Sequence, residues 1–182
     1  MDGESSSRSP ADQGLTHIEK RSRDAASIAI TGQKAIIKIS PLFEALLNSA
    51  DGQSNRVHQH SAAVLVAQTA IEVCTQRLIT KLLDKRGGKF LEDWIDDRLQ
   101  NYNIRNETVR KLYEAVSLDT QLVNQPFWTS SRLKHHVELR NDVAHQGRVA
   151  TPAEAQASLA VAHEVISYLT GIATQHGIDL SN

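Results

Sequence analysis

The sequence has one cysteine, Cys74, among its 182 residues. A single thiol excludes an intramolecular disulfide framework and a cysteine-rich zinc module, and it is typical of a reducing compartment. Long apolar runs are missing as well: the longest, residues 62–67, is far shorter than the roughly 20 residues that cross a bilayer. The first ten residues contain no apolar signal region. We therefore expect a cytoplasmic protein without a membrane partner.

An excess of positive charge is absent too. The chain has 20 lysines and arginines against 21 aspartates and glutamates, which gives a formal net charge of -1. Coating nucleic acid by bulk charge requires a cationic excess, so this mode of binding is excluded. The hydrophobic fraction of 40% is ordinary for a soluble chain with one folded domain. Any binding of nucleic acid would therefore have to come from a local cationic surface.

Apolar residues recur at helical spacing over most of the chain, which predicts an all-α, up-down helical bundle with a flexible N-terminal tail. Residues 1–14 are rich in serine and predict a disordered tail. Residues 15–57 predict N-terminal helices, although the β-branched residues around Gly32 leave a hairpin open over 27–39. Residues 58–176 predict the bundle itself.

Local signals mark several helix ends. Pro41 is typical of a first helical position, and Gly52 is expected to end that short helix. Asn106 is a typical N-cap residue for a later helix. Thr151 and Glu154 have the spacing of a capping box, which predicts the start of a long final helix.

Residues 90–99 predict a further amphipathic helix. Its expected apolar positions are Phe90, Leu91, Trp94, Ile95 and Leu99. Trp94, in this segment, and Trp128, further along the chain, are both interpreted as core or interface aromatics. Cys74 lies on the apolar side of the helix predicted from about residue 58 to 86, where it is expected to be packed and inert.

The segment 133–147 holds the residues best suited to chemistry. Its predicted buried side consists of Leu133, Val137 and Ala144. The same spacing places Arg140 between Val137 and Ala144, where a guanidinium is costly unless it is paired or faces a cleft. Five residues separate Arg140 from His145, so an ideal helix holds them about 140° apart. They converge on one phosphate only through the reach of the arginine or through a second chain, whereas Asn141 and His145 share a face.

An arginine and a histidine together suit cleavage of a phosphodiester without a metal. The imidazole can exchange a proton with a ribose 2′-hydroxyl or with the leaving oxygen. The guanidinium can stabilise charge that develops on the phosphoryl oxygens. The spacing alone fits equally well a helix-end histidine and a salt-bridged arginine, so the alternative stays open.

The string from 139 to 147, Leu-Arg-Asn-Asp-Val-Ala-His-Gln-Gly, resembles the signature of HEPN domains: arginine, a polar residue, three more residues, then histidine. A late helix that ends at the motif, a short loop and a long capped helix match that family too, as does an earlier helix that carries an acidic residue. The resemblance implies an up-down bundle and a metal-independent endoribonuclease of toxin or defence type. Its active site would form between two protomers, so a homodimer is expected.

By this resemblance Arg140 and His145 would be catalytic, Asn141 would support them, and Glu72 would be a candidate cleft residue. The family's toxins that pair with a nucleotidyltransferase antitoxin carry a tyrosine two residues after the histidine. Here that position is Gly147, so neutralisation by that route is not expected, while another antitoxin or regulatory protein remains a possible partner.

Four further residues are candidate RNA contacts: Lys134, His135, His136 and Arg148. Between 132 and 148 there are four arginines and lysines against two carboxylates, a local surplus of 4 − 2 = +2. No metal or cofactor is expected, because His58 and His60 lack a carboxylate or thiol at ligand spacing. The alternative function is a non-catalytic helical module that binds a nucleotide or a partner protein.

Overall fold

The computed structural model describes residues 42–54, 59–99 and 101–180. The chain divides into two compact units, Met1–Lys38 and Ile39–Asn182, and every described residue belongs to the second unit. The expectations for the tail (1–14), for the possible hairpin (27–39) and for helices before residue 42 lie outside the described residues.

The protein is all-α, as the sequence predicts. Its described residues form seven α-helices and no strand. In chain order these helices are α2 (Leu42–Ser54), α3 (His60–Lys85), α4 (Glu92–Arg98), α5 (Glu107–Ser117), α6 (Pro126–Thr129), α7 (Arg132–Gln146) and α8 (Pro152–Gln175). Two short 3₁₀ turns, η2 (Lys89–Leu91) and η3 (Leu122–Asn124), complete the described elements.

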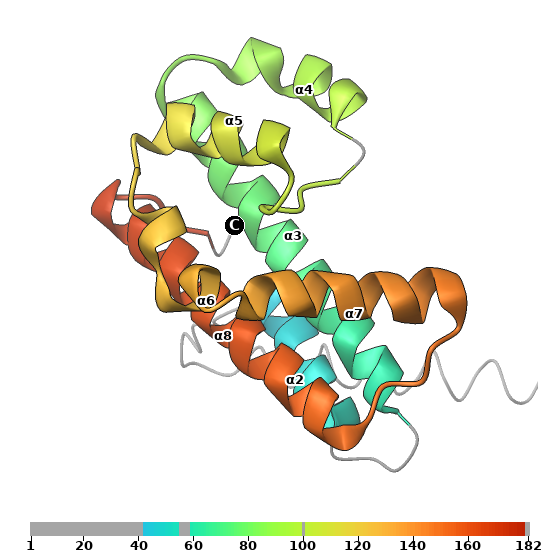
Figure 1. The fold of residues 1–182 in the computed structure, drawn as a ribbon. Helices are drawn as coiled ribbons and strands as arrows, with labels where there is room; N and C mark the ends of the chain where they lie inside the picture. Colours follow the sequence, from blue (N-terminus) through green and yellow to red (C-terminus); the bar gives the residue numbers. More distant parts are fainter. Residues whose placement is uncertain (1–41, 55–58, 100, 181–182) are drawn as a thin grey trace, which may run out of the picture. The chain divides into compact units, whose positions relative to one another are not determined.

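Helix α3 is the centre of the bundle. Helices α2, α7 and α8 pack against it, and α7 crosses it at a steep angle, while α4 and α5 lie over its C-terminal half (Figure 1). The predicted apolar stripe of α3 is buried, from Val64 through Cys74 to Leu82. By length and composition alone, α3 is long and apolar enough to cross a membrane. The core helix of a soluble protein can have the same length and composition.

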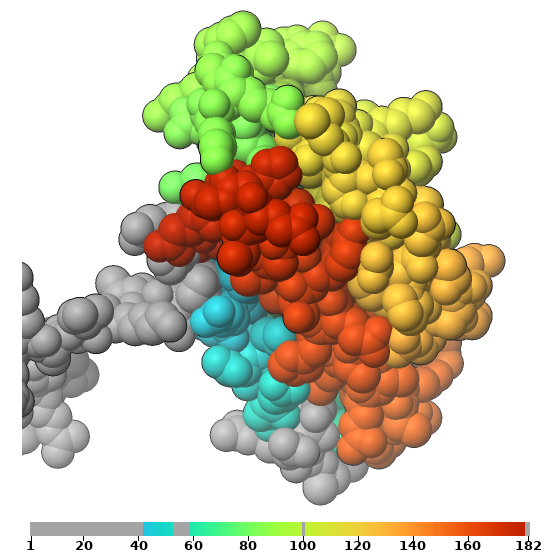
Figure 2. Space-filling model, turned by 90° about the vertical axis from the view of Figure 1, so that its left-hand side faces the viewer, coloured from blue at the N-terminus to red at the C-terminus, as the bar shows by residue number. Residues whose placement is uncertain are grey.

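Helix α8 forms the other long wall of the core. Figure 2 shows it running between α2 on one side and the residues of η3 and α6 on the other. Its start is the predicted capping box: Thr151 Oγ1 accepts a hydrogen bond from the Glu154 N–H at 3.3 Å, and Glu154 Oε2 accepts from the Thr151 N–H at 2.9 Å. Asn106 also caps α5 as expected, accepting from the Thr108 N–H at 2.8 Å. These two helix starts are confirmed.

Two local predictions are wrong. Helix α2 does not end at Gly52 but continues to Ser54, so the roughly 1 kcal/mol that a helical glycine costs does not end the helix there. In α4, Ile95 is the buried residue, whereas Trp94 of the same helix and Phe90 of η2 are exposed. The apolar face predicted for residues 90–99 is therefore mostly at the surface.

Candidate functional site

The candidate catalytic residues lie on α7, whose two ends are set by left-handed residues. Ser131 before it has φ 61°, and Gly147 after it has φ 68°. Glycine adopts this conformation without strain, and its N–H caps the helix by donating to the Asp142 carbonyl. The buried residues of α7 are Leu133, His136 and Leu139. The predicted buried face is therefore rotated, because Val137 is half-buried and Ala144 is exposed.

Arg140 follows the buried His136 by four residues, on the same side of the helix, and it is half-buried. Its Nη1 donates a hydrogen bond of 3.0 Å to the Oδ1 of Asn141. None of the ion pairs among the described residues includes Arg140. The guanidinium is thus oriented by a neutral amide and keeps its charge uncompensated.

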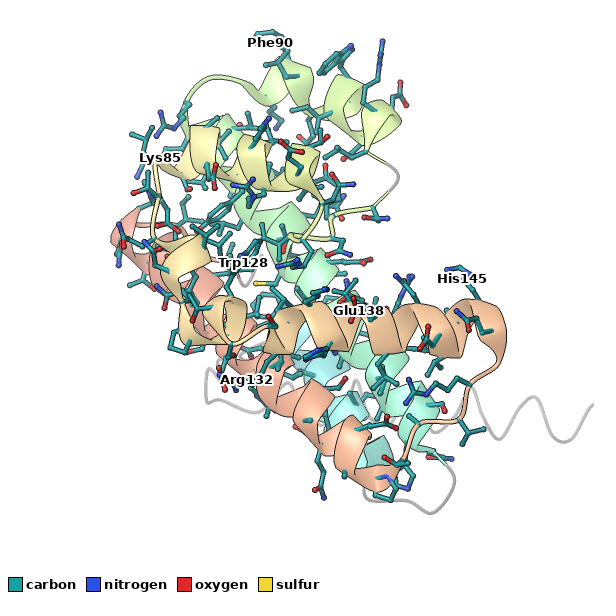
Figure 3. The ribbon with its side chains drawn as sticks, in the orientation of Figure 1. Lys85, Phe90, Trp128, Arg132, Glu138 and His145 are labelled. Carbon is teal, nitrogen blue, oxygen red and sulfur yellow. The ribbon has the colours of Figure 1, made fainter. Side chains whose placement is uncertain are left out.

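His145 is exposed in the last turn of α7. Figure 3 shows it at the opposite end of that helix from Arg132. No hydrogen bond or ion pair of its side chain is found within the described ranges. Its five-residue separation from Arg140 keeps the two side chains on different sides of one helix, so a single copy does not bring them together.

The structure places His136 in the core, where it is 3% exposed. Its Nε2 lies 2.9 Å from Gln68 Oε1 and its Nδ1 lies 2.7 Å from Ser158 Oγ. Burial, together with the positive charge of Arg140, lowers the pKa of His136 to about 4. A neutral ring with its proton on Nε2 donates to Gln68 and accepts from the Ser158 hydroxyl. The expectation that His136 contacts RNA is wrong, because the ring is used inside the protein.

Glu72 lies at the end of the same chain of hydrogen bonds. Gln68 Nε2 donates to Glu72 Oε1 at 2.7 Å, one turn further along α3. The carboxylate is half-buried and makes no ion pair with the described arginines. Buried hydrogen bonds thus connect α8, α7 and α3, and they hold Glu72 in place; its role in a cleft stays a prediction.

The remaining predicted RNA contacts are exposed but largely neutralised. Lys134 lies 3.6 Å from Glu138, and Arg148 contacts both Asp142, at 3.1 Å, and Glu154. Arg132, the fourth cation of this segment, makes a two-pronged pair with Glu164 at 2.6 and 2.7 Å.

Two of these carboxylates, Glu154 and Glu164, belong to α8. They lie outside residues 132–148, so the predicted local charge did not include them. With them the surplus of +2 becomes 4 − 4 = 0. The expected cationic surface is absent from this part of a single copy, and Arg140 is the cation that no carboxylate pairs. His135 is exposed on α7 and stays a candidate contact.

A cavity of about 630 Å³ lies between α7 and α8, and no pattern in the sequence predicts it. The ion pairs of Arg132 and Arg148 link the two helices at either end of this cavity. Its lining residues are Arg132, His135, His136, Glu138, Leu139, Asp142, Arg148, Glu154, Ala157, Ser158, Ala160 and Val161. Neither Arg140 nor His145 is among them. By helical spacing Arg140 faces away from the cavity, whereas His145 lies on the same side of α7 as Glu138, one of its lining residues.

Metal-binding geometry is not found in the described part of the chain, where no three His, Cys, Asp or Glu side chains cluster. The chain matches no family model, no curated protein and no solved structure. The resemblance of residues 139–147 to the HEPN signature therefore stays a prediction from the sequence.

Proposed function

We propose that the protein is a metal-independent endoribonuclease of the HEPN type, with a toxin or defence role. The observation that carries the proposal is the state of the motif: Arg140 is oriented by Asn141, has no carboxylate partner among the described residues, and lies on the same helix as an exposed His145. Arg132, by contrast, is held in a two-pronged ion pair with Glu164. An unpaired, oriented guanidinium suits a phosphate.

In the proposed reaction His145 accepts the proton of a ribose 2′-hydroxyl, whose oxygen attacks the adjacent phosphorus. The bond from phosphorus to the 5′-oxygen breaks, and that oxygen takes up a proton. The products are a 2′,3′-cyclic phosphate and a 5′-hydroxyl. Arg140 stabilises the charge on the non-bridging oxygens. Two copies of the pair facing each other in a homodimer would supply both a base and an acid.

The test is incubation of the full chain with end-labelled RNA in EDTA. We expect cleavage that leaves a cyclic phosphate, and its loss in Arg140→Ala and His145→Ala. Arg140→Lys keeps the charge but loses the two-pronged geometry, so it should remain strongly impaired. His163→Ala, at an exposed histidine on α8, is the matched control and should cleave normally. A requirement for Mg²⁺, or full activity of His145→Ala, would refute the proposal.

The cavity between α7 and α8 favours a second candidate function, a non-catalytic module that binds a small molecule. Its volume lies within the range of ligand pockets. Under this alternative Ala160→Phe, which fills the cavity, abolishes ligand binding, and Arg140→Ala leaves it unchanged. Host toxicity on expression that is relieved by Arg140→Ala would favour the nuclease instead.

A further inference from the structure

Two of the protein's aromatic side chains are exposed, and they are neighbours. Phe90 is 80% exposed and Trp94 58%, with Leu91 beside them at 38%. The chain has three Phe, three Tyr and two Trp, and the other six are buried or half-buried. Phe90 points away from the rest of the bundle (Figure 3). These three residues form what we call the α4 patch.

The exposure of this patch is fixed by local packing. Ile95 is the buried residue of α4, and successive helical residues point about 100° apart, so burying Ile95 turns Trp94 outward. The Tyr102 hydroxyl donates to Asp96 and holds the end of the helix. The Arg98 guanidinium lies over Trp94, 5.3 Å from its ring centroid. Exposed aromatic clusters of this kind mark interaction surfaces, where tryptophan often contributes most of the binding energy.

The charge around the patch selects the kind of partner. Residues 89–98 carry two cations and four carboxylates, a net charge of 2 − 4 = -2. Asp93 and Asp97 are exposed and lie on the same side of the helix as Phe90 and Trp94 by their spacing. Phosphates of RNA and anionic lipids would be repelled by these carboxylates. A positively charged protein surface would be attracted.

A second copy of this chain does not offer such a surface at its cavity. The cavity's charged lining consists of Arg132 and Arg148 against Glu138, Asp142 and Glu154, a formal charge of 2 − 3 = -1. Both surfaces are then acidic, so insertion of Phe90 or Trp94 into a neighbouring copy brings carboxylates together.

We propose that the α4 patch binds a partner protein that presents an apolar cleft rimmed by lysine or arginine. Phe90 and Trp94 enter the cleft, and Asp93 and Asp97 contact its rim. This surface is made by η2 and α4, whereas Arg140 and His145 belong to α7. The proposal therefore goes beyond the nuclease and does not depend on it.

The test uses random peptides displayed on phage, selected against the immobilised full chain. We expect the enriched peptides to combine apolar residues with a positive net charge. Fluorescence polarisation of these peptides should show binding to the wild type and to Leu118→Ser, a control at another exposed leucine (69%). Binding to the double variant Phe90→Ser/Trp94→Ser should be weaker by about thirtyfold or more.

Because both aromatics are exposed, the double variant should keep the urea midpoint of the wild type, and a preserved midpoint separates lost binding from unfolding. Equal affinity of the selected peptides for the double variant would overturn the proposal, as would enrichment of acidic peptides. Sedimentation velocity gives an independent check: self-association that the double variant abolishes would make a second copy the occupant and would also overturn it.

Discussion

His136 and Gln68 are joined by a hydrogen bond of 2.9 Å between Nε2 and Oε1, across 68 positions of sequence. This contact, together with that from His136 to Ser158, ties α7 to α3 and α8 through one buried ring. It holds α7 in the rotation that leaves Arg140 half-buried. The orientation of the candidate arginine thus depends on a neutral histidine one turn before it.

The buried histidine predicts a loss of stability in acid. Burial and the nearby Arg140 lower the pKa of His136 to about 4, whereas the unfolded chain binds this proton near pH 6.5. Since the unfolded state binds more protons between these values, the free energy of unfolding falls as the pH drops from about 7 to about 4. The contribution of this residue is about 3 kcal/mol. Urea unfolding at a series of pH values measures it.

Two variants test whether His136 causes this dependence of the free energy of unfolding on pH. His136→Leu should be less stable at pH 7, because Gln68 and Ser158 lose their partner, yet its stability should vary less between pH 7 and 4. His135→Ala, at the exposed neighbour, should keep the full slope. An unchanged slope in His136→Leu would show that another group is responsible.

The contact between Arg140 and Asn141 predicts graded effects on RNA cleavage. Asn141→Ala removes one hydrogen bond and should slow cleavage about fivefold to tenfold, since such a bond contributes roughly 1 kcal/mol. Asn141→Asp places a carboxylate beside the guanidinium and should be nearly as inactive as Arg140→Ala. Initial rates with labelled RNA give this order, and full activity of Asn141→Asp would contradict it.

The capping box of α8 predicts a measurable loss of stability. Thr151→Ala leaves the Glu154 N–H without its side-chain acceptor and should lower the free energy of unfolding by about 1 kcal/mol. Thr174→Ala is the matched control, because Thr174 is exposed within the same helix and bonds only to the Thr170 carbonyl. Urea denaturation should leave this control unchanged, and equal losses in both variants would argue against a capping role.

The single thiol should be unreactive in the native state. Burial raises the pKa of Cys74 to about 12, so almost no thiolate is present near neutral pH, and the residue is fully buried. Alkylation by iodoacetamide, followed by mass spectrometry, should be slow in buffer and rapid in denaturing urea. Rapid modification of the native protein would show that α3 opens locally.

The parts of the fold that follow from nearby residues could be predicted from the sequence. The capping box at Thr151 and the N-cap at Asn106 bond within three residues, and the apolar stripe of α3 repeats over many turns. Helix α2 shows the limit of local signals, because it continues past Gly52 to Ser54.

The rotation of α7 could not be predicted in the same way. Counting apolar residues favoured Val137 and Ala144 over a histidine, but the buried His136 is compensated by Gln68 and Ser158 on two other helices. The predicted surplus of positive charge was wrong for the same reason, since two of the neutralising carboxylates, Glu164 and Glu154, come from α8. The motif residues Arg140, Asn141 and His145 could be identified without tertiary information, because they lie within six consecutive positions of the sequence.

The cavity between α7 and α8 also bears on how an inhibitor would act. A compound lodged there would press on α7 from the side away from Arg140 and would not occupy the place of the RNA phosphate. If the protein is the proposed nuclease, such a compound would inhibit only by shifting the helix, which would lower kcat and leave KM almost unchanged. Excess substrate would not displace such a compound, so inhibition would persist at saturating RNA.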